Sequence, residues 1–288
     1  MSFLRTEGLT YVYGEGTPFK KQAITNVSID IDKNMLYALI GHTGSGKSTL
    51  VQHLNGLIKP NSGKVIIDGV DIWLEPKKIR DVRFKVGLVF QYPEYQLFDE
   101  TVEKDIAFGP KNLGLNDSEI SERVKWAAEV VGLKSSLLSK SPFDLSGGEK
   151  RRAAIAGVLA MKPEVLILDE PTAGLDPKGR DRLLKTITDY RETYGTAVIL
   201  VSHSMEDVAR VAERVIVMNK GQVELSGTTA EVYSHSDRLS KMGLSVPSIT
   251  QIMLMLRARG LNVPDNVLTV NDARDLLIKL REGGDINA

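Results

Sequence analysis

Residues 41–49 read Gly41-His42-Thr43-Gly44-Ser45-Gly46-Lys47-Ser48-Thr49, between a short apolar run at 37–40 and a segment whose apolar residues recur at helical spacing. The loop matches the pattern G-x-x-x-x-G-K-[ST] in the strand-loop-helix context that this phosphate-binding motif requires. Glycines let successive backbone N–H groups curl around phosphate oxygens, Lys47 brings a positive charge, and Ser48 offers a hydroxyl to Mg²⁺. Residues 41–49 therefore predict a site for ATP and Mg²⁺. The side chain of His42 is interpreted as a spacer, not a ligand or base.

The alternative for this loop is a glycine-rich turn that binds nothing. At ordinary glycine usage, a chance match somewhere in the chain is on the order of 1%. The flanking strand and helix lower that chance further, so we favour the phosphate site.

The composition restricts what else the chain does. It has 288 residues, enough for one large domain or a domain with a small extension. Lys plus Arg and Asp plus Glu both number 37, so no bulk binding of polyanions is expected. The absence of Cys excludes disulfides and thiolate chemistry and fits a reducing compartment. We expect no signal peptide, and no apolar run approaches the roughly 20 residues of a spanning helix, so any membrane role passes through a partner.

Short apolar strands alternate with amphipathic helices along most of the chain, which predicts an α/β fold with a parallel sheet. Strands are expected at 37–40, 165–168 and 198–201, a strand-turn-strand at 64–72, a hairpin at 215–225, and helices from the phosphate loop to Ile58 and over 118–131. Two further amphipathic stripes, 249–256 and 273–280, predict a small helical extension in about the last fifty residues. Thr269 is the expected N-cap of the second, with Asp272 near position N3.

An acidic pair ends the apolar strand at 165–168. Ligands and catalytic groups collect at the carboxyl ends of parallel strands, and neighbouring strand residues point in opposite directions. We therefore expect Asp169 to bind Mg²⁺ and Glu170 to act on the attacking water. The alternative is an acidic helix cap or a solvated turn, which the upstream phosphate loop disfavours.

A second candidate anion site is Leu145-Ser146-Gly147-Gly148-Glu149, where a serine N-cap and two glycines open a helix. The alternative is an ordinary capped helix. The pentapeptide resembles the signature motif of ATP-binding cassette (ABC) ATPases, which contacts the γ-phosphate held by the opposite subunit. The resemblance spans residues 3 to 235, although Glu149 stands where Gln is common.

Other ABC motifs follow in the expected order. Gln91 resembles the glutamine that touches Mg²⁺ and communicates with the transmembrane partner, Asp176 belongs to a D-loop-like segment, and His203 resembles the switch histidine that senses the γ-phosphate. Tyr13 resembles the aromatic residue that stacks on adenine, with Tyr11 as a competitor. The resemblance implies an ABC ATPase with a RecA-like core, an antiparallel β subdomain and a helical subdomain.

The resulting assignment has three groups. The predicted catalytic residues are Glu170, His203 and Gln91. The predicted metal ligands are Ser48, Gln91 and Asp169. The predicted nucleotide-binding residues are Tyr13, Gly41, His42, Thr43, Gly44, Ser45, Gly46, Lys47, Ser48, Thr49, Ser146, Gly147, Gly148 and Asp176.

Further segments narrow the family. The aromatic-rich stretch 90–98, together with 54–57, 154–157 and the helical extension, resembles the ATPases of energy-coupling factor (ECF) transporters, which import vitamins and transition-metal ions. Segments 40–46, 16–19 and 157–161 resemble the second of their two paired ATPases. The implied domains are 1–235, with a helical subdomain at about 92–160, and an extension at 236–288 for dimer contacts.

The ECF resemblance implies the partners and location. They are a second ATPase (a copy or a homologue), a transmembrane T component docking near residues 91–98 and a substrate-binding S component, with no nucleic acid, at the cytoplasmic face of the membrane. Two subunits would close head-to-tail around two ATP molecules and so move the T and S components. The aromatic residues at 92–98 could instead pack within their own subdomain. Alternative functions are the ATPase of another ABC importer and a soluble ABC ATPase acting on DNA or ribosomes.

Overall fold

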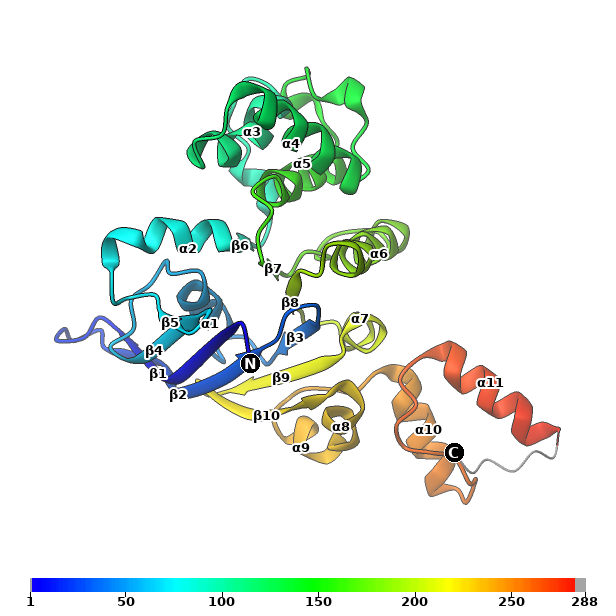
Figure 1. Cartoon of the computed structure of the whole chain (residues 1–288). Coiled ribbons are helices and arrows are strands. Elements are labelled where there is room, and N and C mark those ends of the chain that lie inside the picture. Colours follow the sequence, from blue (N-terminus) through cyan, green and yellow to red (C-terminus); the bar gives the residue numbers. More distant parts are fainter. Residues whose placement is uncertain (1, 283–288) are drawn as a thin grey trace.

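The structure is a computed structural model and describes residues 2–282. It contains two sheets (Figure 1). The smaller sheet is antiparallel with the order β2-β1-β4-β5. Its strands are β1 (Leu4–Tyr13), β2 (Lys21–Ile31), β4 (Ser62–Ile67) and β5 (Val70–Asp71).

The larger sheet has the order β10-β9-β3-β8-β7-β6. All neighbours are parallel except β9 and β10, which form the predicted hairpin. Val201 of β8 lies opposite both Leu39 of β3 and Asp169 of β7, so three strands end at one edge. The phosphate loop, the acidic pair and His203 all follow at that edge. The strands are β3 (Leu36–Ile40), β6 (Val86–Val89), β7 (Val165–Asp169), β8 (Ala197–Val201), β9 (Arg214–Asn219) and β10 (Gln222–Thr228).

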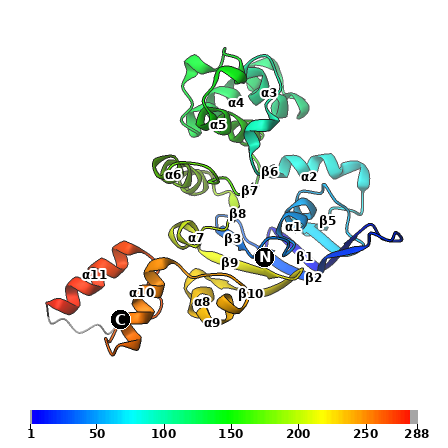
Figure 2. The same ribbon diagram turned by 180° about the vertical axis from the view of Figure 1, so that it is seen from behind.

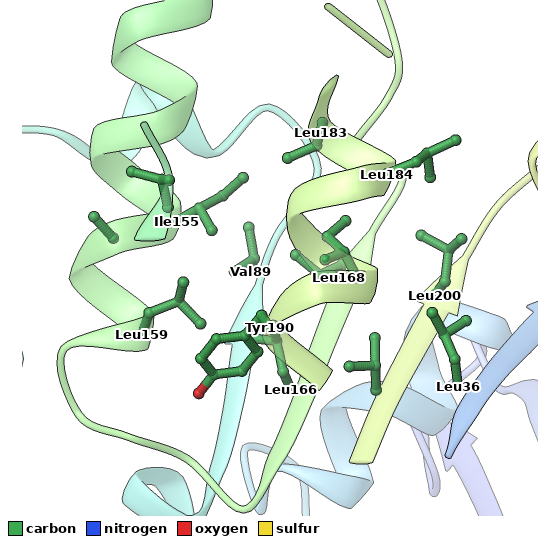
Figure 3. Packing of buried hydrophobic residues seen from close by; sticks show 14 of the residues in the cluster. Leu36, Val89, Ile155, Leu159, Leu166, Leu168, Leu183, Leu184, Tyr190 and Leu200 are labelled. Carbon is green, nitrogen blue, oxygen red and sulfur yellow. The ribbon is translucent and has the colours of Figure 1, made fainter. Parts of the chain in front are cut away.

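Both faces of the larger sheet are covered. Alternate residues of β3 belong to different hydrophobic clusters, because successive strand side chains point to opposite faces. Figure 3 shows one face, where Leu183 and Leu184 of α6 pack with Leu168 of β7 and Leu200 of β8. The helices around the sheets are α1 (Lys47–Leu54), α2 (Ile79–Lys85), α6 (Pro177–Tyr194), α7 (Met205–Val211), α8 (Thr229–Ser234) and α9 (Ser236–Lys241).

Helix α1 is shorter than its apolar stripe predicts. It ends at Leu54, with Asn55 as C-cap, so Leu57 and Ile58 lie beyond it. Gly56 follows with φ +68°, a left-handed conformation that stops a helix and that glycine adopts most readily. The prediction of a helix to Ile58 was therefore wrong at its C-terminal end.

Three helices inserted between β6 and β7 form a separate group above the sheets in Figure 1. They are α3 (Val102–Asn112), α4 (Asp117–Val130) and α5 (Gly147–Leu159), and α4 begins with a capping box between Asn116 and Glu119. Their apolar side chains join the core cluster of the larger sheet. Short 3₁₀ helices lie at Pro76–Lys78, Pro93–Gln96, Ser135–Leu137 and Pro142–Asp144.

The C-terminal helices are α10 (Ser248–Ala258) and α11 (Val270–Arg281). Both predicted stripes are helical, and Thr269 caps α11 by accepting the N–H of Asp272. Met253, Val263, Val267 and Ala273 form a hydrophobic cluster of their own. The pair projects from one side of the body in both views (Figures 1 and 2). Over residues 2–282, the structure has no helix with the length and apolar character needed to span a bilayer.

Candidate functional site

The phosphate loop depends on glycines at two tight positions. A Cβ on Gly41 would lie 2.3 Å from the carbonyl oxygen of Met218, and one on Gly46 would lie 2.8 Å from that of Ala23. Both residues have positive φ, and Gly46 is the N-cap of α1. Gly44, in contrast, has open space beside it. The sequence therefore curls the loop around an open anion site at the amino end of a helix.

Lys47 is buried at the base of this loop. Its Nζ donates hydrogen bonds to the carbonyl oxygens of Gly41, at 2.6 Å, and His42, at 3.1 Å. Burial lowers the pKa of Lys47, while the nearby Glu170 and Asp169 carboxylates raise it. The ammonium group thus has acidic neighbours but no salt bridge among the described residues, as expected of a cation held for a phosphate.

Asp169 ends β7 and faces the start of α1. Its Oδ2 lies 3.5 Å from the Oγ of Ser48. Burial raises the pKa of Asp169, whereas the Lys47 charge and the Ser48 hydroxyl lower it. Hydroxyl and carboxylate oxygens are ligands that Mg²⁺ uses, together with phosphates of the substrate. Within residues 2–282, the structure has no group of three or more His, Cys, Asp or Glu side chains that could hold a metal ion.

Glu170, the residue after Asp169, approaches His203. Its φ of +51° is unusual for a residue with a side chain, and such strain gathers at functional sites. Its Oε1 lies 3.1 Å from the Nε2 of His203, without the alignment of a good hydrogen bond. Burial raises the pKa of Glu170 to about 7, partly offset by the backbone N–H of His203. A carboxyl group with this pKa takes up and releases a proton near neutral pH.

These groups converge on one cavity of about 360 Å³. Tyr13 lines it and approaches Thr49, with 3.3 Å between the two hydroxyl oxygens, whereas the ring of Tyr11 packs against His53. The other predicted residues that line the cavity are Thr43, Gly44, Gly46, Lys47, Ser48, Thr49, Gln91, Asp169, Glu170 and His203. The predicted residues Gly41, His42 and Ser45 lie in the loop but do not line the cavity.

Three lining residues are absent from the sequence-based assignment. Lys21, Gln22 and Ala23 at the start of β2 border the cavity beside the phosphate loop. They match no phosphate-binding motif, and the only signal for them is their position shortly after Tyr13 in a β-hairpin.

Comparison with known proteins agrees with this geometry. A family model described as ABC transporter matches residues 24–173, more than half of the chain. The chain is 53% identical over 280 residues to the "Energy-coupling factor transporter ATP-binding protein EcfA2" of Caldanaerobacter subterraneus subsp. tengcongensis, covering 97% of this chain and 98% of the relative. The protein of that name from Clostridium tetani is 56% identical over 278 residues, covering 96% of each.

This chain belongs to the ECF transporter ATPases of the ABC family. A solved structure of cbiO1 from Clostridium perfringens, described as part of the ABC transporter complex cbiONQ, has a TM-score of 0.74 and 38% identity, covering 88% of this chain and 98% of its own. A dimeric ATP-binding cassette in a post-hydrolysis state, bound to ADP and Pi, has a TM-score of 0.70 and 27% identity over 78% of this chain and 98% of its own. The predicted ABC ATPase fold, activity and second place in the ECF pair are confirmed.

The signature segment of this ECF ATPase lies away from its own phosphate loop. Ser146 is the N-cap of α5 and forms a capping box with Glu149: its Oγ accepts the backbone N–H of Glu149, and its own N–H donates to Oε2 of Glu149 at 2.9 Å. Gly148 and Asp176 line a different cavity, of about 690 Å³, which shares no lining residue with the first. Ser146, Gly147, Gly148 and Asp176 are therefore not brought to the ATP cavity within one chain.

Proposed function

We propose that this chain energises the uptake of a vitamin or transition-metal ion by an ECF transporter, as the ATP-hydrolysing subunit at the cytoplasmic face of the membrane. The observation that carries the proposal is the convergence of Lys47, Asp169, Glu170 and His203 on one cavity at the carboxyl edge of the larger sheet. The family names and the cbiONQ description of a solved relative support the transport role.

Within the site, Ser48, Asp169 and Gln91 would hold Mg²⁺, which supplies charge neutralisation to the phosphates when bound. Lys47 would exchange its bonds to loop carbonyls for bonds to the outer phosphates. Glu170 would orient the attacking water and accept its proton. His203, within 3.1 Å of Glu170, would hold that carboxylate in place and sense the terminal phosphate.

The ATP cavity is proposed to be half of a composite site. Ser146, Gly147 and Gly148 would complete the site of the opposite ATPase, with Asp176 at the same interface. Their placement outside the chain's own ATP cavity supports this arrangement. So does the dimeric state of the cassette relative that is bound to ADP and Pi.

The exposed aromatic residues after Gln91 are the proposed dock for the T component. Tyr95 is 84% exposed and Phe98 63% exposed, so much of each side chain remains accessible to a partner. Phe98 and Phe108 meet edge-to-face and line a groove of about 330 Å³ together with Leu97. Aromatic side chains in a partly apolar groove suit a protein interface. Through the T component the ATPase would act on an S component.

The C-terminal extension, assigned to residues 236–288, is proposed to contribute dimer contacts. Residues 283–288 lie outside the described part of the chain. Exposed apolar side chains support the proposal, namely Ile252, Met255, Leu261, Val270 and Ile278. Leu239, Leu244 and Val246 nevertheless belong to the core cluster of the larger sheet. The separate cluster of the C-terminal helices contains only residues from Ile249 onward.

The transport function is tested by purifying the membrane complex through a tag on this chain and identifying its components by mass spectrometry. We expect a second ECF ATPase or a copy of this chain, a T component and an S component, and ATP-dependent uptake by proteoliposomes containing that complex. Co-purification of nucleic acid or ribosomes in place of membrane proteins would refute the proposal. The matched control is the same preparation with Lys47→Ala, which should assemble but not take up substrate.

A further inference from the structure

The turn that carries His203 continues directly into helix α7. Ser204 caps this helix, and its Oγ accepts the backbone N–H of Asp207 at 3.2 Å. The N–H of Ser204 in turn donates to the Oγ of Ser202 at 3.0 Å. Because these bonds fix the backbone on both sides of His203, the position of its ring follows the first turn of α7.

A buried carboxylate joins this turn to the segment after Glu170. Asp207 is 1% exposed, and its Oδ2 accepts the Thr172 hydroxyl at 3.0 Å. The nearest cation is Arg180 of α6, with Nε 3.7 Å from the same oxygen. Burial raises the pKa of Asp207. The positive charge of Arg180 lowers this pKa, and the charge of Arg210 lowers it to a smaller extent. The negative charge of Asp207 also raises the pKa of Glu170.

The neighbouring residue joins the same turn to the C-terminal extension. Glu206 Oε1 accepts both the hydroxyl of Ser248, at 2.9 Å, and its backbone N–H, at 3.3 Å. Ser248 is the first residue of α10. Within residues 2–282, these are the hydrogen bonds that connect residues 248–282 to the chain before residue 236. The Ser248 bonds also lower the pKa of Glu206, against the effect of its partial burial.

We propose that Glu206 and Asp207 are positioning residues for His203, and that through Ser248 the C-terminal extension regulates ATP hydrolysis. The proposal rests on the roles proposed above for Glu170 and His203. Asp207 holds the turn against the segment that follows Glu170, and Glu206 holds it against α10. A displacement of α10, such as one caused by pairing of two extensions, therefore moves His203 relative to Glu170.

A simple structural tether is the alternative, and it makes a different prediction. Ser248 and Glu206 are both exposed, so loss of their bonds costs the folded chain little. A tether would affect stability or pairing but leave turnover in the assembled complex unchanged. If Ser248 and Glu206 position His203, loss of their bonds lowers kcat. The KM for ATP stays the same, because the phosphate loop is not altered.

The test measures steady-state ATP hydrolysis by the full chain in its assembled complex. We expect Ser248→Ala to lower kcat about threefold at unchanged KM, the size of one hydrogen bond, and Ser248→Thr to restore it. Ser240→Ala is the matched control, because Ser240 is an exposed serine of α9 with no side-chain hydrogen bond among the described residues, and it should behave as the wild type. An unchanged kcat in Ser248→Ala, or a loss that Ser248→Thr does not restore, would overturn the proposal.

A second variant tests whether Asp207 positions His203. Asp207→Asn keeps an oxygen for the Thr172 hydroxyl but loses the charge that attracts Arg180, so we expect kcat to fall while the KM for ATP stays the same. An unchanged kcat would contradict a positioning role for Asp207. Glu170→Gln in the same complex distinguishes failure of the positioning proposal from failure of the catalytic role proposed for Glu170. If it is inactive while Ser248→Ala is normal, only the positioning proposal fails. If it still hydrolyses ATP, the assignment of Glu170 fails first.

Discussion

The ATP cavity and the C-terminal extension differ in how they are held. The cavity is built largely from loops at the ends of β3, β7 and β8, whose apolar residues are buried in two hydrophobic clusters. Residues 248–282 of the extension have a cluster with four buried members and are joined to the body by the Glu206–Ser248 bonds and by apolar contacts such as that of Leu268. The cavity is therefore held by the core on several sides, whereas residues 248–282 are held at few points. Chemistry is expected in the first region and control of pairing or rate in the second.

The largest effect is expected inside the cavity. Glu170→Gln should retain ATP binding and lose turnover by about a hundredfold or more, because the variant cannot accept the proton of water. The measurement is ATPase activity of the assembled complex, with nucleotide binding measured separately. Glu164→Gln is the control, since Glu164 is an exposed partner of Lys33. Near-normal hydrolysis by Glu170→Gln would remove the proposed chemical distinction between the two regions.

The next largest effect is expected at the composite ATP site. Ser146→Arg should lower hydrolysis about a hundredfold at the partner's site while leaving nucleotide binding at its own phosphate loop intact. A mixed dimer in which only one subunit carries the variant, assayed with site-specific nucleotide labelling, checks this. Ser136→Arg, in the 3₁₀ helix Ser135–Leu137 of the same helical group, is the control; Ser136 is exposed, and the change should have no effect. Loss of only the mutant chain's own nucleotide would contradict the composite site.

The pKa of Glu170 predicts an acid limb. With a pKa of about 7, Glu170 is mostly protonated below pH 7 and cannot act as a base there. Since kcat/KM reports the free enzyme, it should rise about tenfold between pH 6 and pH 8. A stopped assay across this range, with a buffer control at constant ionic strength, measures it. A flat profile would show that proton transfer to Glu170 does not limit the reaction.

The smallest effect is expected from the extension. Truncation after Ser245 should leave the cavity folded and weaken pairing of the ATPases by roughly tenfold, about 1.4 kcal/mol. Light scattering over a concentration series measures the pairing, and nucleotide binding by the monomer is the control. An unchanged dimer would refute the proposed contacts. Turnover as low as that of Glu170→Gln, measured where the dimer is saturated, would show that the two regions are not separable.

The sequence predicts the cavity well because its chemistry lies in short local motifs. Residues 41–49, 169–170 and 203 each follow an apolar strand, and the parallel sheet then brings their ends together. The same locality explains the correct N-caps at Ser146 and Thr269. Roles in the opposite subunit stay predictions, since they depend on a second chain.

Other features have no local signature. Lys21, Gln22 and Ala23 reach the cavity only because β2 pairs with β1, far from any phosphate-binding pattern. The bond between Glu206 and Ser248 joins exposed residues 42 positions apart, which neither hydrophobic periodicity nor a motif reveals. The early end of α1 did have a signal, because Gly56 follows Asn55 directly and glycine favours the end of a helix.

The place of β3 in the sheet has a consequence during synthesis on the ribosome. Within its sheet, β3 pairs with β8 and β9, which begin at Ala197 and Arg214. At about 5–20 residues per second, the nascent chain waits on the order of 8–30 s after Ile40 before the first of these strands is translated. During that interval β3 is an unpaired apolar segment, a typical target for chaperones. Slow codons before β8 should therefore raise aggregation of newly made chains more than slow codons after β10.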